Sequence, residues 1–146
     1  MNPTIQNRQA RFAYHLDDVF TAGLQLYGTE VKSLREGKAN LSDSYCYLND
    51  RGELYIKNLH IAEFRLGTFS NHLPLRERKL LLKKNELAKI QKALKDVGTT
   101  IVPLKLFFSA RGWAKLEIAT AKGKKLHDKR AALKERDIDR DTKREI

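Results

Sequence analysis

Hydrophobic and polar residues alternate along much of this chain with the period of two that marks β-strands. Turn-forming clusters rich in Asp, Asn, Ser and Gly separate the alternating segments in pairs. The pattern therefore predicts three β-hairpins. Their strands span residues 12–16 and 19–27, residues 43–48 and 53–61, and residues 99–108 and 113–119. Gly23 and Pro103 lie inside strands, where they predict a bend or bulge that curls the sheet.

Two helices are expected between these strands. The first occupies residues 29–36, with Thr29 as its N-cap, Glu30 in its first turn and Gly37 just past its end. The second follows Asn85 and ends at Gly98. Apolar residues recur along it at helical spacing, namely Leu87, Ile90, Leu94 and Val97. We expect a long surface loop over residues 62–74 and a short helical turn over residues 76–84.

These elements favour a mainly β fold, a small closed antiparallel barrel of the oligonucleotide-binding type with short helices. An open α+β sandwich is the alternative. The chain has 146 residues, of which 41% are hydrophobic, enough for one modest core. We predict an RNA-binding domain over residues 1–121. Residues 122–146 hold ten Lys or Arg and six Asp or Glu, and we predict a basic tail that is disordered when free and helical on a partner.

The charge of the chain points to a polyanionic partner. Its 29 Lys and Arg against 18 Asp and Glu give a net charge of +11. Cys46 is the only cysteine, which excludes a disulfide framework and suits a reducing cytoplasm. No metal-ligand spacing, phosphate-binding loop or membrane-spanning run is present, so we expect no metal, no cofactor and no membrane partner. We further expect a cytoplasmic monomer.

Two segments carry a resemblance to a known family. They are GTEVKSLREGKANLSDSY at residues 28–45 and GKKLHDKR at residues 123–130. Together with their order along the chain, they resemble the SsrA-binding protein (SmpB) family of bacterial ribosome rescue. The resemblance implies a closed oligonucleotide-binding barrel and no enzymatic activity. It also implies an adaptor that binds the tRNA-like domain of transfer-messenger RNA (tmRNA) and delivers it to stalled ribosomes for rescue and peptide tagging.

The resemblance also implies RNA-binding positions on the domain. Asn7, Leu81 and Lys115 match family positions implicated in binding the tRNA-like RNA. From its own sequence Leu81 is as easily a core residue. Further basic candidates for RNA contact are Arg11, Lys32, Arg35 and Lys38. Many relatives carry Glu where Thr21 stands, so a Glu-based contact at that position is not carried over.

The tail is expected to contact the ribosome. By resemblance, it occupies the empty mRNA path and reaches the decoding centre. His127 can stack on an unpaired base while neighbouring cations bind phosphates. The predicted ribosome-contacting residues are Lys124, Lys125, His127, Asp128, Lys129 and Arg130.

Two other functions are compatible with the sequence. A small ribonuclease would need His60 or His72 beside Glu30 or Glu63 as acid and base. A ribosomal or cold-shock-like barrel would carry aromatic residues in a strand pattern facing nucleic acid, and the sequence does not show such a pattern. The non-catalytic adaptor is therefore the favoured reading.

Overall fold

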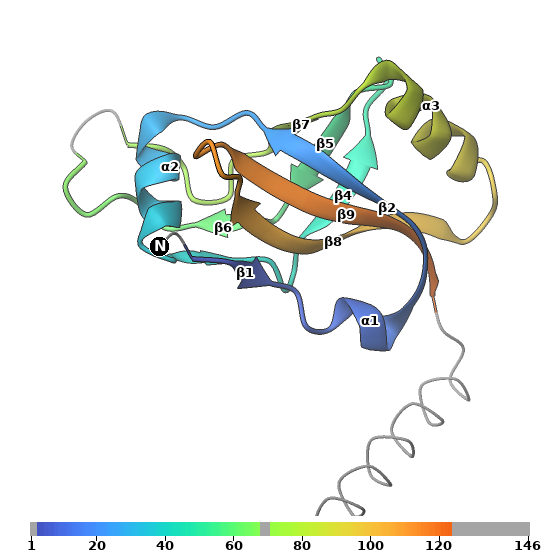
Figure 1. Ribbon diagram of the computed structural model, residues 1–146, viewed down its shortest axis with the longest axis horizontal. Coiled ribbons are helices and arrows are strands. Elements are labelled where there is room, and N and C mark those ends of the chain that lie inside the picture. Colours follow the sequence, from blue (N-terminus) through green and yellow to red (C-terminus); the bar gives the residue numbers. More distant parts are fainter. Residues whose placement is uncertain (1–2, 68–70, 124–146) are drawn as a thin grey trace, which may run out of the picture.

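The computed structural model describes residues 3–67 and 71–123, which form a mainly β structure with three short helices (Figure 1). The strands are β1 (Ile5–Gln6), β2 (Tyr14–Leu24), β3 (Ala39–Asn40), β4 (Tyr45–Leu48), β5 (Leu54–Lys57), β6 (His60–Ile61), β7 (Arg78–Leu81), β8 (Thr99–Phe108) and β9 (Ala114–Gly123). The helices are α1 (Ala10–Ala13), α2 (Gly28–Arg35) and α3 (Lys84–Ala93). No helix in these two ranges has the length and hydropathy that a membrane span requires.

Seven strands form one antiparallel sheet in the order β1-β8-β4-β5-β7-β2-β9. β9 also pairs with β8, so the pairings from β8 through β4, β5, β7, β2 and β9 return to β8. The contact between β4 and β8 is the narrowest, a single pair of Cys46 with Ile101. The strands β3 and β6 form a separate two-stranded sheet beside α2.

Inward-facing residues of the large sheet form the main core, in which Ile56, Leu116 and Ile118 are completely buried. A second, smaller cluster lies on the outer side of β8 and β9, where Ala10 of α1 packs with Ala119 and other buried residues. Small side chains on the last part of β9 therefore accept α1. The outer side of β9 near Lys115 and Glu117 is left more open.

The first predicted hairpin is wrong. Residues 14–24 form one strand, β2, which pairs along its length with β9. Asp17 and Asp18 lie at a register shift between Leu16 and Val19, where the strand bulges instead of reversing. The backbone N–H of Asp18 donates to Thr120 Oγ1 at 3.1 Å, so a residue far along the chain satisfies the bulged backbone. Gly23 is regularly paired, and the bulge expected there lies six residues earlier at Asp17.

The second and third hairpins are confirmed as β4–β5 and β8–β9. β8 has a register shift between Pro103 and Lys105, as Pro103 predicts. Several boundaries differ from expectation; α3, for example, begins at Lys84 with Lys83 and not Asn85 as its N-cap. β5 ends at Lys57 and not at residue 61, because Asn58 has a φ of 62°. β9 continues past Ala119 to Gly123, and α3 ends at Ala93 and not near Gly98.

The segment expected to be a helical turn is the strand β7, in which Leu80 is buried and Leu81 is exposed. Alternate residues of a strand face opposite sides of the sheet, and this separates the two leucines. Val97, expected on the apolar face of α3, lies beyond its end and is fully exposed.

Candidate nucleic-acid interface

Two of the predicted RNA-binding residues, Leu81 and Lys115, share one groove. Gly23 of β2 pairs with Leu81 of β7 on one side and with Lys115 of β9 on the other. Because Gly23 has no side chain, a depression of about 320 Å³ lies between the two larger residues. The groove is also lined by Trp113 and by the end of β2 with the residues that follow it, 24–26. Leu81 is 49% exposed, which places it on the surface and not in the core.

Trp113 is a groove residue that the sequence prediction missed. It follows the β8–β9 turn, where the backbone N–H of Ser109 donates to the Trp113 carbonyl at 2.8 Å and Gly112 has φ of 85°. Its side chain is 68% exposed, which is unusual for so large an apolar residue. A signal was present in the sequence, because Trp113 stands directly after a turn and two residues before Lys115.

Lys115 is the cation of this groove. Within the described ranges it makes no ion pair, unlike Lys105, whose Nζ lies 3.5 Å from Glu117 Oε2. The depression is therefore lined by the residues Trp113, Leu81 and Lys115, an indole, an aliphatic side chain and an ammonium group without an ion pair in the described ranges. This combination suits a nucleotide, whose base stacks on aromatic rings and whose phosphate binds a cation.

Asn7 lies on the same side of the molecule, in a neighbouring depression lined by Lys105 and Glu117. Its Nδ2 donates to the Pro103 carbonyl at 2.9 Å, and its backbone N–H donates to the Leu104 carbonyl at 2.8 Å. Its Oδ1 is buried and accepts no hydrogen bond within the described structure. The amide is thus held rigidly with one acceptor left unused.

The basic residues of α2 form a separate cluster. Glu36, at the end of the helix, accepts Lys38 Nζ at 3.2 Å and Arg65 Nε at 3.3 Å. Lys32 Nζ lies 5.4 Å from the centre of the Phe64 ring. Arg35, one helical turn from Lys32, is exposed. Lys32, Arg35 and Lys38 are therefore on the surface as predicted, but they do not line the groove of Lys115.

The N-cap of α2 lies two residues earlier than predicted. Tyr27, not Thr29, is the N-cap, and its backbone N–H donates to Glu30 Oε1 at 2.8 Å. Glu30 thus caps the helix as expected. Gly37 has φ of 74°, which is the left-handed conformation predicted for the residue past the helix end.

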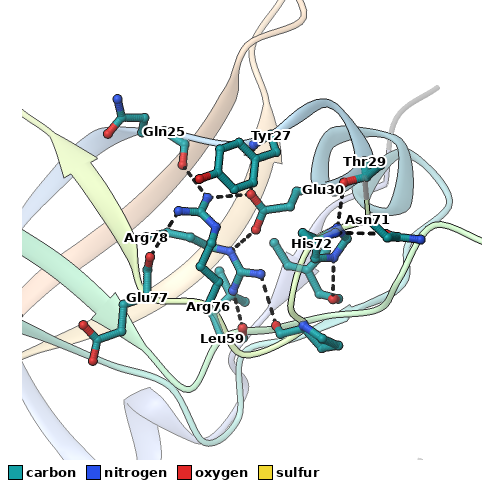
Figure 2. A network of polar contacts seen from close by, with 12 residues as sticks. Gln25, Tyr27, Thr29, Glu30, Leu59, Asn71, His72, Arg76, Glu77 and Arg78 are labelled. Atoms are coloured by element: carbon teal, nitrogen blue, oxygen red, sulfur yellow. Dashed lines mark hydrogen bonds and ion pairs between the residues drawn. The ribbon is translucent and has the colours of Figure 1, made fainter. Parts of the chain in front are cut away.

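A buried ion-pair network holds α2 against β7 (Figure 2). Glu30 and Arg78 are both completely buried and bond through Oε2 and Nε. Arg76 reaches Glu30 Oε1 at 2.5 Å, and its guanidinium stacks over the Tyr27 ring at 4.2 Å. Arg78 also donates to the carbonyls of Leu59 and Pro74. The charge of Arg78 is therefore neutralised inside the fold and is not available to a partner.

The network sets the ionisation of its members. Burial alone would raise the pKa of Glu30, but hydrogen bonds from Arg76, the Tyr27 backbone and Arg78 together hold it below its usual value of 4.5. Burial lowers the pKa of Arg78, and the Glu30 carboxylate opposes that shift. The pair is therefore ionised at neutral pH.

His72 is not arranged for acid–base catalysis with Glu30. His72 is buried, with Nδ1 2.9 Å from Thr29 Oγ1 and Nε2 2.9 Å from the Ile61 carbonyl (Figure 2). Because a carbonyl only accepts, Nε2 carries the proton and Nδ1 accepts from Thr29. Both ring nitrogens are thus engaged away from Glu30, whose oxygens bind arginines. His72 joins the loop before β7 to the start of α2.

Neither a metal site nor a reactive thiol is found among the described residues. No cluster of three or more His, Cys, Asp or Glu in residues 3–67 and 71–123 could hold a metal ion. Cys46 is buried, and burial raises the pKa of its thiol. A buried, protonated thiol is a poor nucleophile.

The predicted tail residues Lys124, Lys125, His127, Asp128, Lys129 and Arg130 lie outside the described residues, as does the side chain of Arg11 in α1. The point at which the tail begins is defined. Gly123 pairs with Tyr14 at the far end of β9 from Lys115. At about 3.3 Å per residue, the two positions lie roughly 26 Å apart along the strand.

The chain resembles known proteins over nearly its whole length. The SmpB protein family model matches residues 4–146. An SsrA-binding protein of Bacteroides thetaiotaomicron is 54% identical over 140 residues, covering 96% of this chain and 93% of that protein. An SsrA-binding protein of Phocaeicola vulgatus is 53% identical over 147 residues, covering 99% and 97%.

A solved structure shows the same fold. It is described as "tmRNA-SmpB: a journey to the center of the bacterial ribosome", and its matching chain has a TM-score of 0.71 and 43% sequence identity. The match covers 90% of this chain and 94% of that chain. Family motifs, whole-length identity to SsrA-binding proteins and a shared mainly β fold agree, and we conclude that this chain belongs to the SmpB family.

Proposed function

We propose that this protein is a non-catalytic RNA-binding adaptor of trans-translation. It binds the tRNA-like domain of tmRNA through the groove between Leu81, Trp113 and Lys115, and it delivers that RNA to stalled ribosomes for rescue and peptide tagging. The observation that carries this proposal is the grouping around Gly23 of an exposed indole, an exposed leucine and a lysine that has no ion pair among the described residues, in a chain of the SmpB family.

The division between a closed barrel over residues 1–121 and a ribosome-contacting tail over residues 122–146 is part of the proposal. Support for the barrel comes from strand pairings that return from β9 to β8. Support for separate roles comes from the roughly 26 Å along β9 between Lys115 and Gly123, the last described residue, which separates the groove from the end that leads into the tail. The Asn7 amide and the α2 cations would extend the RNA contact around the groove.

A salt titration with the full chain and the tRNA-like domain of tmRNA tests the function. We expect tight binding that resists competition by ordinary tRNA and leaves the RNA intact. The logarithm of the affinity should fall linearly with the logarithm of salt concentration, by roughly 0.7 to 0.9 for each phosphate neutralised. The readouts are a binding isotherm at each salt concentration and RNA integrity on a gel.

Two outcomes would contradict the proposal. If any tRNA competes equally well, the protein binds RNA through its positive charge without specificity for the tRNA-like domain. Cleaved RNA in the same samples would instead restore the ribonuclease alternative.

The tail has its own prediction. The triple variant His127→Ala, Lys129→Ala, Arg130→Ala should bind the tRNA-like domain nearly as well as the wild type, because the groove is unchanged. It should impair peptide tagging on stalled ribosomes, because stacking and phosphate contacts in the mRNA path are lost. Binding and tagging are measured in parallel, and an equal loss of both would argue against separate roles.

A further inference from the structure

A second surface with nucleotide-binding chemistry lies on the outer side of β4, β5 and β7. Cross-strand pairs place Tyr45 opposite Lys57, Tyr47 opposite Tyr55, and Tyr55 opposite Lys79. The alternate residues on these strands point into the core, so these five side chains share the outer face. We call them the tyrosine face. Contrary to the sequence-based expectation, the strands do carry an aromatic pattern, which pairing across strands reveals.

The rings of this face are positioned before any ligand binds. Tyr47 and Tyr55 stack with ring centres 6.1 Å apart and planes inclined by 26°. The Tyr47 hydroxyl donates to Glu77 Oε2 at 2.6 Å, and this hydrogen bond, with burial and charge, raises the pKa of Tyr47 to about 12. Tyr45 is 43% exposed, so its ring is open to a partner. Rigid aromatic groups lose little entropy when a base stacks on them.

Cations flank the rings. Lys57 Nζ lies 3.8 Å from Glu77 Oε1, and both side chains are nearly half exposed. Exposed pairs at such separations contribute little, so Lys57 can exchange the carboxylate for a phosphate. Lys79 is held more tightly, with Nζ 2.5 Å from Glu53 Oε2. The face therefore offers three rings, one readily available cation and one anchored cation.

We propose that the tyrosine face binds an unpaired RNA segment, with bases stacked on Tyr45 and Tyr47 and a phosphate on Lys57. Stacking on aromatic rings beside cations is how sheet surfaces bind single-stranded RNA without strong sequence preference. This inference deepens the proposed function, on which it rests, by adding a second RNA surface. Two observations favour RNA over a protein partner: the net charge of +11, and continuity through β7, which carries both Lys79 and the groove residue Leu81.

The test uses the full chain and a short fluorescent oligouridine that forms no duplex. The variant Tyr45→Thr/Tyr47→Thr removes the rings while keeping residues that suit a strand, and Tyr45→Phe/Tyr47→Phe keeps the rings. We expect the Thr variant to lose affinity by roughly 5- to 150-fold for each base that stacks, and the Phe variant to bind like the wild type. Thermal unfolding of both variants verifies that they are folded.

The groove variant Lys115→Ala separates the two proposals. It should lose affinity for the tRNA-like domain of tmRNA, and the factor by which the Thr variant weakens oligouridine binding should be the same in this background as in the wild type. Oligouridine binding that is absent in the wild type, or unchanged in the folded Thr variant, would overturn the tyrosine face whatever the tRNA-like domain does. Equal loss in the Phe and Thr variants would also overturn it. If the wild type binds an arginine-rich peptide and not oligouridine, and the Thr variant loses that binding, the tyrosine face would be a protein-binding surface.

Discussion

Replacing Glu30 with Gln is expected to lower the free energy of unfolding by about 3–5 kcal/mol, the usual cost of removing one partner from a buried ion pair. The reason is the position of Arg78, which is completely buried and bonds to Glu30. A neutral amide leaves the guanidinium charge in the interior without a counter-ion. The total free energy of unfolding of a small domain is only about 5–15 kcal/mol, so the variant should be marginally stable. Urea denaturation of both proteins measures the difference.

Glu36→Gln is the matched control, because it makes the same change at the other end of α2. Glu36 also bonds to two cations, Lys38 and Arg65, but on the surface. Solvent already screens those charges, so we expect little change in stability. Similar losses in the two variants would mean that the burial of Glu30 does not determine its contribution.

The pH dependence gives an independent measurement of the same pair. The pKa of Glu30 is held below its usual value of 4.5 in the folded protein. A carboxyl group whose pKa is lower in the folded than in the unfolded protein stabilises the fold at every pH above its unfolded pKa. That stabilisation is lost as the pH falls through the folded pKa. The difference in stability between wild type and Glu30→Gln should therefore be constant at neutral pH and shrink below about pH 4.5. A difference that grows on acidification would contradict this assignment.

The same network has a functional consequence. Glu30 caps α2 and bonds to Arg78, which also donates to the carbonyls of Leu59 and Pro74. Arg76 stacks on the Tyr27 ring. A single carboxylate thus fixes the start of α2 relative to β7, which carries Leu81 into the groove. Glu30 acts on RNA binding through position, because its oxygens are fully occupied inside the protein.

Local sequence signals predicted the elements that local residues determine. The Asn49–Gly52 and Ser109–Gly112 turns, the strand over Thr99–Phe108 and the glycine that ends α2 all depend on neighbours in the chain. Glu30 was also placed correctly in the first turn of the helix, where it accepts a hydrogen bond from a backbone only three residues away.

Features that depend on distant partners were missed. Asp17 and Asp18 resemble a turn, but β9 pairs with the strand on both sides of them and turns them into a bulge. Three consecutive leucines, the last of them just past the end of β7, conceal the alternation that separates buried Leu80 from exposed Leu81. Arg78 is buried only because Glu30, 48 residues earlier, neutralises it. The tyrosine face likewise becomes visible only when β4 and β5 are paired.

The candidate groove was likewise predicted only in part. Family resemblance supplied Leu81 and Lys115, but it did not indicate that Gly23 lies between them. The basic candidates Lys32, Arg35 and Lys38 came from the charge pattern of the predicted helix, and none of them lines the groove. Trp113 went unnoticed because a tryptophan after a turn is ordinarily a core residue, and only its 68% exposure identifies it as a surface for binding.

Two groove substitutions are expected to weaken tRNA-like domain binding in different ways. Trp113→Ala should lower affinity by roughly 5- to 150-fold at every salt concentration, because a stacked base is lost and no charge changes. Lys115→Ala should lower affinity most at low salt and reduce the log–log salt slope by roughly 0.7 to 0.9, because one phosphate contact is lost. Salt titrations of both variants with the tRNA-like domain measure the two effects.

Controls make this contrast decisive. Trp113→Phe keeps an aromatic ring and should recover most of the affinity. Lys89→Ala removes a charge from α3, which lies at the opposite end of the molecule from α2 (Figure 1), and this variant should leave the salt slope nearly unchanged. Trp113 is exposed and Lys115 makes no ion pair within residues 3–67 and 71–123, so neither change should unfold the protein. Parallel salt slopes for Lys115→Ala and wild type would place the phosphate contact elsewhere. Undiminished affinity of Trp113→Ala would remove base stacking from the groove and leave an electrostatic surface alone.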